Sequence, residues 1–153
     1  MPVPPPRSQH GFTLIETLVV MVIIALLAAV MAPNMISTPN TRLRADASEL
    51  INALRETRLH AMRTRQAAVM QVNTRELFYR LPGQHKAQQL DDELTLQLTT
   101  AESELSDDEQ GGIRFFADGS STGGRITLSN GSLVQHVDVE WLTGKVRLLD
   151  GQP

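Results

Sequence analysis

An apolar stretch near the N-terminus constrains this chain more than any other feature. From Phe12 to Ala32 the sequence reads FTLIETLVVMVIIALLAAVMA, and the polar residues among these 21 are Thr13, Glu16 and Thr17. A helix of that length measures about 31 Å, which is enough to cross the hydrocarbon core of a bilayer. The alternative is a buried helix in a soluble protein, but the remaining residues, about 120, could hardly surround it. We therefore expect a membrane-inserted helix here.

The flanking sequence favours a retained anchor over a cleaved secretory signal. A secretory signal has an apolar region of about 7–15 residues followed by a cleavage site with small residues. Here the apolar run is longer and is followed by Pro33-Asn34. Residues 1–11 (MPVPPPRSQHG) are rich in proline and contain one arginine and no acid, so we interpret them as a short cytoplasmic leader. Arginines on both flanks leave the orientation open by charge alone.

Glu16 is the ionisable residue of the apolar segment. An acidic side chain at the centre of a bilayer costs on the order of 2.5–3.5 kcal/mol, so an ionisable residue there suggests a function. Glu16 lies about 6 Å along the helix from Phe12, where it can still reach the interface and remain solvated. Alternatively, the Glu16 carboxylate is paired with an amine inside the apolar layer. Cleavage between Gly11 and Phe12 would create an α-amine one turn away from the Glu16 carboxylate, and pairing within or between copies would offset the cost of both charges.

The segment Gly11-Phe12-Thr13-Leu14-Ile15-Glu16, placed directly before an unbroken apolar stretch, resembles the prepilin signal of type IV pilins and type II secretion pseudopilins. The resemblance implies that a prepilin peptidase cuts after Gly11 and methylates the new amine of Phe12. It also implies that Glu16 guides docking of the subunit into a helical filament.

A second helix is expected after Pro33 and Pro39, which would each interrupt a helix. From Thr41 to about Ala67 apolar residues recur at spacings of three and four residues and form one stripe: Leu43, Ala47, Leu50, Ile51, Leu54, Ala61 and Met62. Six arginines against three acids give this segment a charge of +3. We interpret the charges as a solvated face, with contact to lipid headgroups or to an acidic neighbouring subunit as the alternative.

From residue 68 onward the hydrophobic period changes to two, which is typical of strands. The stretches AVMQV, LFYRL, LTLQLT, IRFF, RITLS, LVQHVDVEW and KVRLL each predict a strand. Asn130-Gly131 predicts a type I′ hairpin turn, and Thr143-Gly144 a second tight reversal.

These patterns predict an α+β fold, in which a long N-terminal hydrophobic helix is packed against a C-terminal antiparallel β-sheet or β-sandwich domain. Together with the resemblance to a prepilin signal, they imply a leader peptide (1–11), a transmembrane or filament-core helix (12–32), a periplasmic amphipathic part of the helix (33–67) and a β-rich globular domain (68–153).

The segments ALRETRLHAMRTRQAAVMQV, IRFFADGSSTGGRITLS and VEWLTGKVRL are similar to the C-terminal domain shared by H-type minor pseudopilins (GspH) and FimT-type minor pilins. The resemblance implies a minor subunit near the tip of the periplasmic pseudopilus of type II secretion in a Gram-negative bacterium. It would cross the inner membrane once, with its C-terminal domain in the periplasm. The implied partners are prepilin peptidase, the other minor pseudopilins, the major pseudopilin and the secreted cargo.

A FimT-like minor pilin of a type IV pilus that binds DNA is the main alternative. DNA binding calls for a clustered basic surface. From residue 110 onward the chain contains four basic residues, Arg114, Arg125, Lys145 and Arg147, against four acids, Asp118, Asp138, Glu140 and Asp150. We therefore expect no nucleic-acid partner.

Enzymatic chemistry finds little support in the sequence. Cysteine is absent, which excludes disulfides and a cysteine nucleophile. Residues 119–124 (GSSTGG) lack the Gly-Lys-Ser/Thr of a phosphate-binding loop, and the four histidines lack metal-ligand spacing. A membrane-tethered periplasmic enzyme is the alternative of another class, but we expect no catalytic residues, cofactor or metal.

Eight acids and no base lie between residues 91 and 109. We expect a flexible, solvated loop there. A metal site, or a docking surface for a positively charged partner, remains open.

Overall fold

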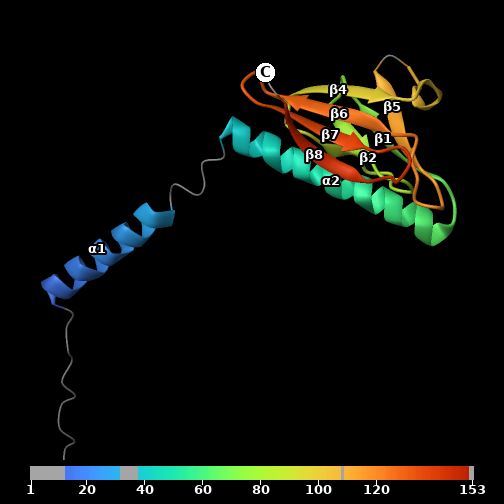
Figure 1. The fold of residues 1–153 in the computed structure, drawn as a ribbon. Coiled ribbons are helices and arrows are strands. Elements are labelled where there is room, and N and C mark those ends of the chain that lie inside the picture. The colour runs from blue at the N-terminus through green and yellow to red at the C-terminus, as the bar shows by residue number, and fades with distance from the viewer. Residues whose placement is uncertain (1–12, 32–37, 108, 152–153) are drawn as a thin grey trace, which may run out of the picture. The chain divides into compact units, whose positions relative to one another are not determined.

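The computed structural model describes residues 13–31, 38–107 and 109–151 of the chain (Figure 1). The chain divides into two compact units, Met1–Ser37 and Thr38–Pro153.

In the first unit, the described residues 13–31 form helix α1 (Leu14–Met31). Its first turn is held by Thr13, whose carbonyl oxygen accepts a hydrogen bond from the Glu16 amide at 3.0 Å. Beyond Thr17 the helix consists of apolar residues, so the predicted helix is confirmed over 14–31. Its predicted terminal residues, Phe12 and Ala32, lie outside the described residues.

No helix within residues 13–31 and 38–151 is at once long and apolar enough to cross a membrane.

The second unit begins with helix α2 (Pro39–Thr64), whose start differs from the prediction. Pro39 does not interrupt a helix but occupies its first turn, where its missing N–H costs nothing. The hydroxyl of Thr38, at the N-cap, accepts a hydrogen bond from the Thr41 amide. The helix ends before Ala67 because Arg65 adopts a left-handed conformation with φ of 55°.

The predicted apolar stripe of α2 is buried except for Met62, which is 40% exposed. The prediction missed Ala53 and Thr57, which are also buried. Thr57 is tolerated in the core because its hydroxyl donates to the Ala53 carbonyl oxygen at 2.8 Å.

Within the described residues of the second unit, eight strands form two antiparallel four-stranded sheets. The first sheet has the order β3-β2-β1-β5 and contains β1 (Ala68–Asn73), β2 (Phe78–Arg80), β3 (Gln88–Gln89) and β5 (Gln110–Phe115). The second has the order β4-β6-β7-β8 and contains β4 (Thr95–Thr100), β6 (Gly124–Ser129), β7 (Val134–Val139) and β8 (Val146–Gly151). All seven predicted strands are present. The missed strand, β3, consists of two glutamines and has no apolar alternation to detect.

One core lies between α2 and both sheets. In Figure 1, α2 runs along the sheets, and it contacts β1 and β5 of the first sheet and β6, β7 and β8 of the second. The largest fully buried side chains come from all three layers: Phe115, Leu43, Leu50, Leu54, Met70, Ile113, Ile126 and Leu128. Every buried hydrophobic residue of the described chain lies between Leu43 and Val146, so this unit completes its core without α1. The predicted α+β fold is confirmed, and the helix that covers the sheets is α2.

The β6–β7 connection is not the predicted type I′ turn. That turn requires positive φ at both central residues, but only Gly131 has it (84°) and Asn130 does not. Instead, the Asn130 side-chain oxygen accepts hydrogen bonds from the amides of Ser132 and Leu133, which forms a longer four-residue loop. The second predicted reversal is confirmed, since the Gly144 amide donates to Glu140 and its φ is 61°.

Replacing Asp138 by Asn is expected to make the stability of the domain less dependent on pH. Asp138 lies opposite Arg125 on neighbouring strands, and two hydrogen bonds of 2.6 and 2.7 Å join the side chains. These bonds hold the pKa of Asp138 below its ordinary value, against the opposing effect of partial burial. A lowered folded-state pKa stabilises the fold above the unfolded-state pKa of about 3.9, and the stabilisation is lost as the pH falls through the folded-state pKa.

We therefore expect Asp138→Asn to lower the free energy of unfolding by about 0.5–1 kcal/mol at pH 7 and to leave it almost unchanged at pH 2. Urea unfolding of residues 38–153 at pH 7, 4 and 2 measures this difference, with Asp92→Asn, at an exposed position, as the control. A difference that stays constant over this pH range would contradict the assignment.

Candidate assembly site

Of the three predicted site residues, the structure describes Glu16; Gly11 and Phe12 lie outside the described residues. Glu16 is exposed in the first turn of α1, where a negative charge is favoured by the helix dipole. Its side chain has no ion-pair or hydrogen-bond partner within the described part of the chain. The carboxylate is therefore available to a partner outside the structure.

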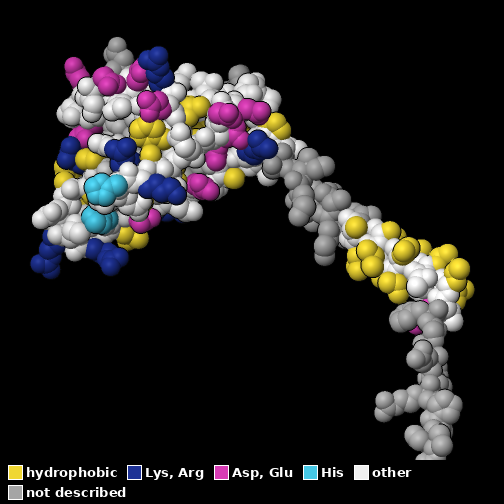
Figure 2. All heavy atoms as spheres, turned by 180° about the vertical axis from the view of Figure 1, so that it is seen from behind, with side chains coloured by type: hydrophobic (Ala, Val, Ile, Leu, Met, Phe, Trp, Pro, Cys, Tyr) yellow, Lys and Arg dark blue, Asp and Glu magenta, His cyan; other side chains and the backbone are white. Residues whose placement is uncertain are grey.

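Between Leu18 and Ala28, α1 presents an apolar surface on every side. The large hydrophobic side chains described between Leu14 and Leu27 are all at least 46% exposed, and in Figure 2 hydrophobic side chains are spread along this helix. Such a helix needs an apolar environment, either lipid or other helices. The structure therefore places one carboxylate at the start of an otherwise apolar surface.

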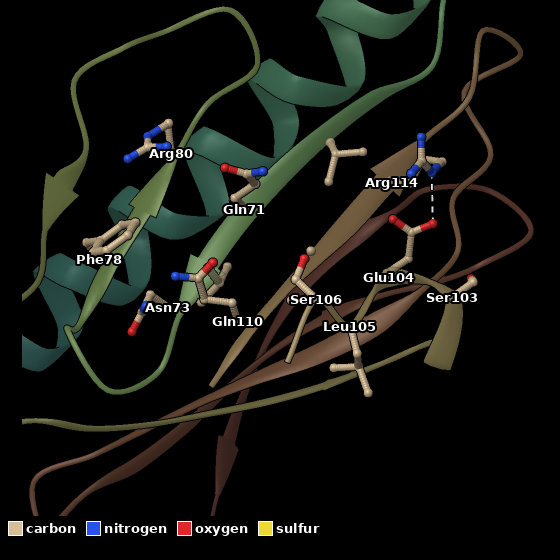
Figure 3. Close-up of a pocket in the computed structure, with 14 residues that line it drawn as sticks. Gln71, Asn73, Phe78, Arg80, Ser103, Glu104, Leu105, Ser106, Gln110 and Arg114 are labelled. Atoms are coloured by element: carbon tan, nitrogen blue, oxygen red, sulfur yellow. Dashed lines mark hydrogen bonds and ion pairs between the residues drawn. The ribbon is translucent and has the colours of Figure 1, made fainter. Parts of the chain in front are cut away.

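A polar cleft of about 260 Å³ lies on the face of the first sheet that points away from α2. Gln71 of β1 and Arg80 of β2 line it from the sheet, while Glu104 and Ser106 line it from the segment before β5 (Figure 3). A Cβ added at Gly112, which is paired with Gln71, would lie 2.5 Å from Val69 Cγ1, so a larger residue here would have to displace the Val69 side chain.

Two arginines give the cleft its charge. Arg114 forms an ion pair of 2.8 Å with Glu104 (Figure 3), and this bond raises the pKa of the guanidinium. The guanidinium of Arg80 lies 5.6 Å from the centre of the Phe78 ring, and its buried Nε has no hydrogen-bond partner within the described residues. The cleft can therefore donate hydrogen bonds to a carbonyl or carboxylate group. It presents no nucleophile with a neighbouring base among the residues described.

The acidic run is not the flexible loop that we expected. It contains strand β4, which the apolar alternation of LTLQLT had predicted. Three of its carboxylates are bound by arginines from other elements: Asp91 by Arg42 at 3.2 Å, Glu104 by Arg114 at 2.8 Å and Glu109 by Arg75 at 3.1 Å. Glu104 is only 6% exposed. The prediction failed because the counter-charges are distant in sequence.

The described residues contain no group of three or more histidine, aspartate or glutamate side chains that could hold a metal ion. Near the start of the run, the carboxylate of Asp46 accepts a hydrogen bond from the Asp91 amide. Burial raises the pKa of Asp46, and the charge of Asp91 adds to this effect.

Residues 119–124, which lack the sequence of a phosphate-binding loop, form a turn in which three glycines have a structural reason. Gly119, Gly123 and Gly124 have positive φ, and β6 follows directly, as expected for a turn and not for a phosphate-binding loop. His136 is half-buried on the outer face of β7, and its Nδ1 lies 2.9 Å from the Thr127 hydroxyl.

Arg58 is the main structural residue that the sequence analysis missed. We interpreted it as part of a solvated face. Instead, its Nε donates to the Gly119 carbonyl oxygen at 2.9 Å and its Nη2 to that of Thr143 at 3.0 Å. The side chain therefore joins α2 to two loops that lie 61 and 85 residues further along the chain. No local pattern could have indicated this.

An exposed apolar helix with one acid in its first turn, together with an amphipathic helix packed against two antiparallel sheets, defines the chain as a pilin-like subunit. Two family models match it: "Prokaryotic N-terminal methylation motif" over residues 6–32 and "Type II transport protein GspH" over residues 46–143. The chain belongs to the GspH family of type II secretion minor pseudopilins.

Relatives of known sequence and structure agree with this. The chain is 35% identical to the type II secretion system protein H of Xanthomonas campestris pv. campestris over 142 residues, which cover 92% of this chain and 83% of that protein. Its fold is similar to that of the minor pseudopilin EpsH of Vibrio cholerae, with a TM-score of 0.56, 12% identity and coverage of 71% of this chain and 97% of EpsH.

The type IV minor pilin FimU of Pseudomonas aeruginosa has an equally similar fold, with a TM-score of 0.56, 16% identity and coverage of 74% of this chain and 95% of FimU. The fold alone therefore does not separate the two machines. The family model and the sequence relative favour type II secretion over the type IV pilus alternative.

Proposed function

We propose that this chain is cut after Gly11 by a prepilin peptidase, methylated at the amine of Phe12 and assembled near the tip of the periplasmic pseudopilus. The match of the methylation-motif model to residues 6–32 supports the processing step. In this proposal residues 1–11 are the leader, residues 12–32 hold the subunit in the inner membrane, and residues 33–67 and 68–153 extend into the periplasm.

Glu16 is the residue on which this proposal depends. Its exposed carboxylate lies in the first turn of an otherwise apolar helix. Cleavage would place the new amine of Phe12 four residues away, and an amine of the same or a neighbouring copy would neutralise the carboxylate in an apolar environment. During assembly, helix contacts replace lipid contacts, so the apolar surface loses little free energy on transfer.

The proposed partners are the prepilin peptidase, the other minor pseudopilins, the major pseudopilin and the secreted cargo. We propose a structural role without catalysis and without nucleic-acid binding. Three of the four basic residues in the last third of the chain support this, because Arg114, Arg125 and Arg147 are each paired with a carboxylate. Such pairing reduces the positive charge available to a phosphate backbone.

Replacing Glu16 by Leu is expected to leave processing intact but to prevent assembly. The variant removes the only charge among the described side chains of α1, so its insertion into lipid improves while the pairing with the Phe12 amine is lost. In cells whose secretion system contains the full-length variant, we expect secretion to fall by at least about tenfold. This corresponds to a loss of about 1.4 kcal/mol or more in the free energy of assembly. Glu76→Leu, at an exposed position of the globular unit, is the control. Normal incorporation of the Glu16→Leu chain into the pseudopilus would contradict the proposal.

A further inference from the structure

A groove of about 740 Å³ separates the C-terminal half of α2 from the connection between β7 and β8. Arg55, Arg58 and Leu59 line it from the helix, and Lys145 and Arg147 line it from the other side. We refer to it as the α2–β8 groove. The two hydrogen bonds of Arg58 to the neighbouring loops fix its shape, so the groove is preformed.

The charge of the α2–β8 groove is strongly unbalanced. It contains four cationic side chains and one acid, Glu140. Arg147 lies 3.5 Å from Glu140, and Arg58 is bound to backbone carbonyls. Arg55 and Lys145 are exposed, and within the described residues their side chains have no ion-pair or hydrogen-bond partner. Two cations are therefore free to meet carboxylates from outside.

The same groove offers apolar contacts. Leu59, which lines the groove, is 55% exposed. Trp141 and Leu142 do not line it but lie on the β7–β8 connection between the lining residues Glu140 and Thr143, and they are 67% and 63% exposed. Large aromatic and apolar side chains surrounded by charge are typical of the residues that carry binding energy in protein interfaces. A nucleic-acid backbone would not use these apolar residues.

We propose that the α2–β8 groove binds an acidic segment of a neighbouring pseudopilin, in which two or more carboxylates flank an apolar side chain. The carboxylates pair with Arg55 and Lys145, and the apolar side chain contacts Leu59. Charge complementarity identifies this occupant, because unpaired cations steer an acidic partner and fix its register. The inference rests on the proposed function, since it assigns a surface to the contacts within the filament.

Photocrosslinking in the full-length chain tests the proposal, with the other pseudopilins of its system present in the same cells. A photoreactive residue replaces Leu59 or Leu142, and in the control it replaces Gln97, which is exposed on β4. We expect positions 59 and 142, but not 97, to crosslink to another pseudopilin, with the crosslinked peptide rich in Asp or Glu. A crosslink to a segment without acids or to lipid would overturn the proposal.

Charge reversal provides the matched comparison. We expect Arg55→Glu/Lys145→Glu to reduce the crosslink from position 59 at least tenfold, whereas Arg44→Glu/Lys86→Glu, with the same change in net charge at exposed positions outside the groove, leaves it unchanged. The neutral pair Arg55→Gln/Lys145→Gln replaces the first variant if that one does not fold. Equal loss in both double variants would overturn the proposal, as would binding of duplex DNA that depends on Arg55 and Lys145.

The two proposals fail in different ways. Normal processing and Glu16-dependent assembly without a crosslink from position 59 would overturn only the proposal that the α2–β8 groove binds an acidic segment. Assembly that is independent of Glu16 would contradict the proposed function.

Discussion

A chain in which Leu replaces Gly11 is expected to remain uncut and to start at Met1. The peptidase implied by the resemblance cuts directly after this residue, and a branched side chain at the scissile bond would obstruct it. Without cleavage the amine of Phe12 stays in a peptide bond and cannot carry a positive charge. Glu16 then lacks its partner, and the cost of its charge in an apolar layer is not offset.

Mass spectrometry of the purified full-length protein measures this directly. The natural chain should begin at Phe12 and carry one additional methyl group, whereas Gly11→Leu should retain residues 1–11 without methylation. Secretion should fall to the level of a strain that lacks the protein. Gln9→Leu, two residues upstream of the proposed cleavage site, is the control and should be cut normally. If Gly11→Leu were processed like the natural chain, the cleavage assignment would be wrong.

Replacing Gly144 by Ala is expected to cause a large loss of stability in the globular unit. Gly144 is buried with φ of 61°, a conformation that L-residues rarely adopt. An added Cβ would overlap the Gly119 carbonyl oxygen and would lie 2.8 Å from the Arg58 Nε. To accommodate the Cβ, the two loops that Arg58 joins must move apart. We therefore expect the free energy of unfolding to fall by about 2–4 kcal/mol.

Gly131→Ala separates the conformational cost from the steric one. Gly131 has φ of 84°, but an added Cβ there meets no atom within 4 Å. We expect a loss of about 1 kcal/mol, due to the backbone alone. Urea unfolding of residues 38–153 measures both variants, since this unit contains the whole buried core of the described residues. Similar losses for the two variants would show that the loop contact at Gly144 contributes nothing.

The features predicted correctly from the sequence are those with a local period. The spacing of Leu43, Ala47, Leu50 and Leu54 places them on one face of α2, and all are buried. Alternation of apolar residues located seven of the eight strands because successive side chains of a strand point to opposite faces. The family resemblance was likewise carried by short continuous segments.

The incorrect predictions concern residues whose environment is set by distant parts of the chain. Met62 fits the helical period but lies at the end of α2 beside Gly119, where no layer covers it. The acids between residues 91 and 109 looked solvated because Arg42, Arg75 and Arg114, which bind three of them, belong to other elements. The Asn130 side chain accepts hydrogen bonds from amides of its own loop, and these bonds stabilise a four-residue loop in place of the expected two-residue turn.

The sequence by itself determined the apolar N-terminal helix with its acid at position 16, the amphipathic helix, the strands and the family. All of these depend on spacings within one element, and the linear order of residues contains such spacings directly. Only the tertiary structure decided that Arg58 joins two loops and which carboxylates form ion pairs. It also decided that Arg55 and Lys145 find no side-chain partner among the described residues beside Leu59. These depend on which elements pack together, because the free energy of a charge is set by its neighbours in space.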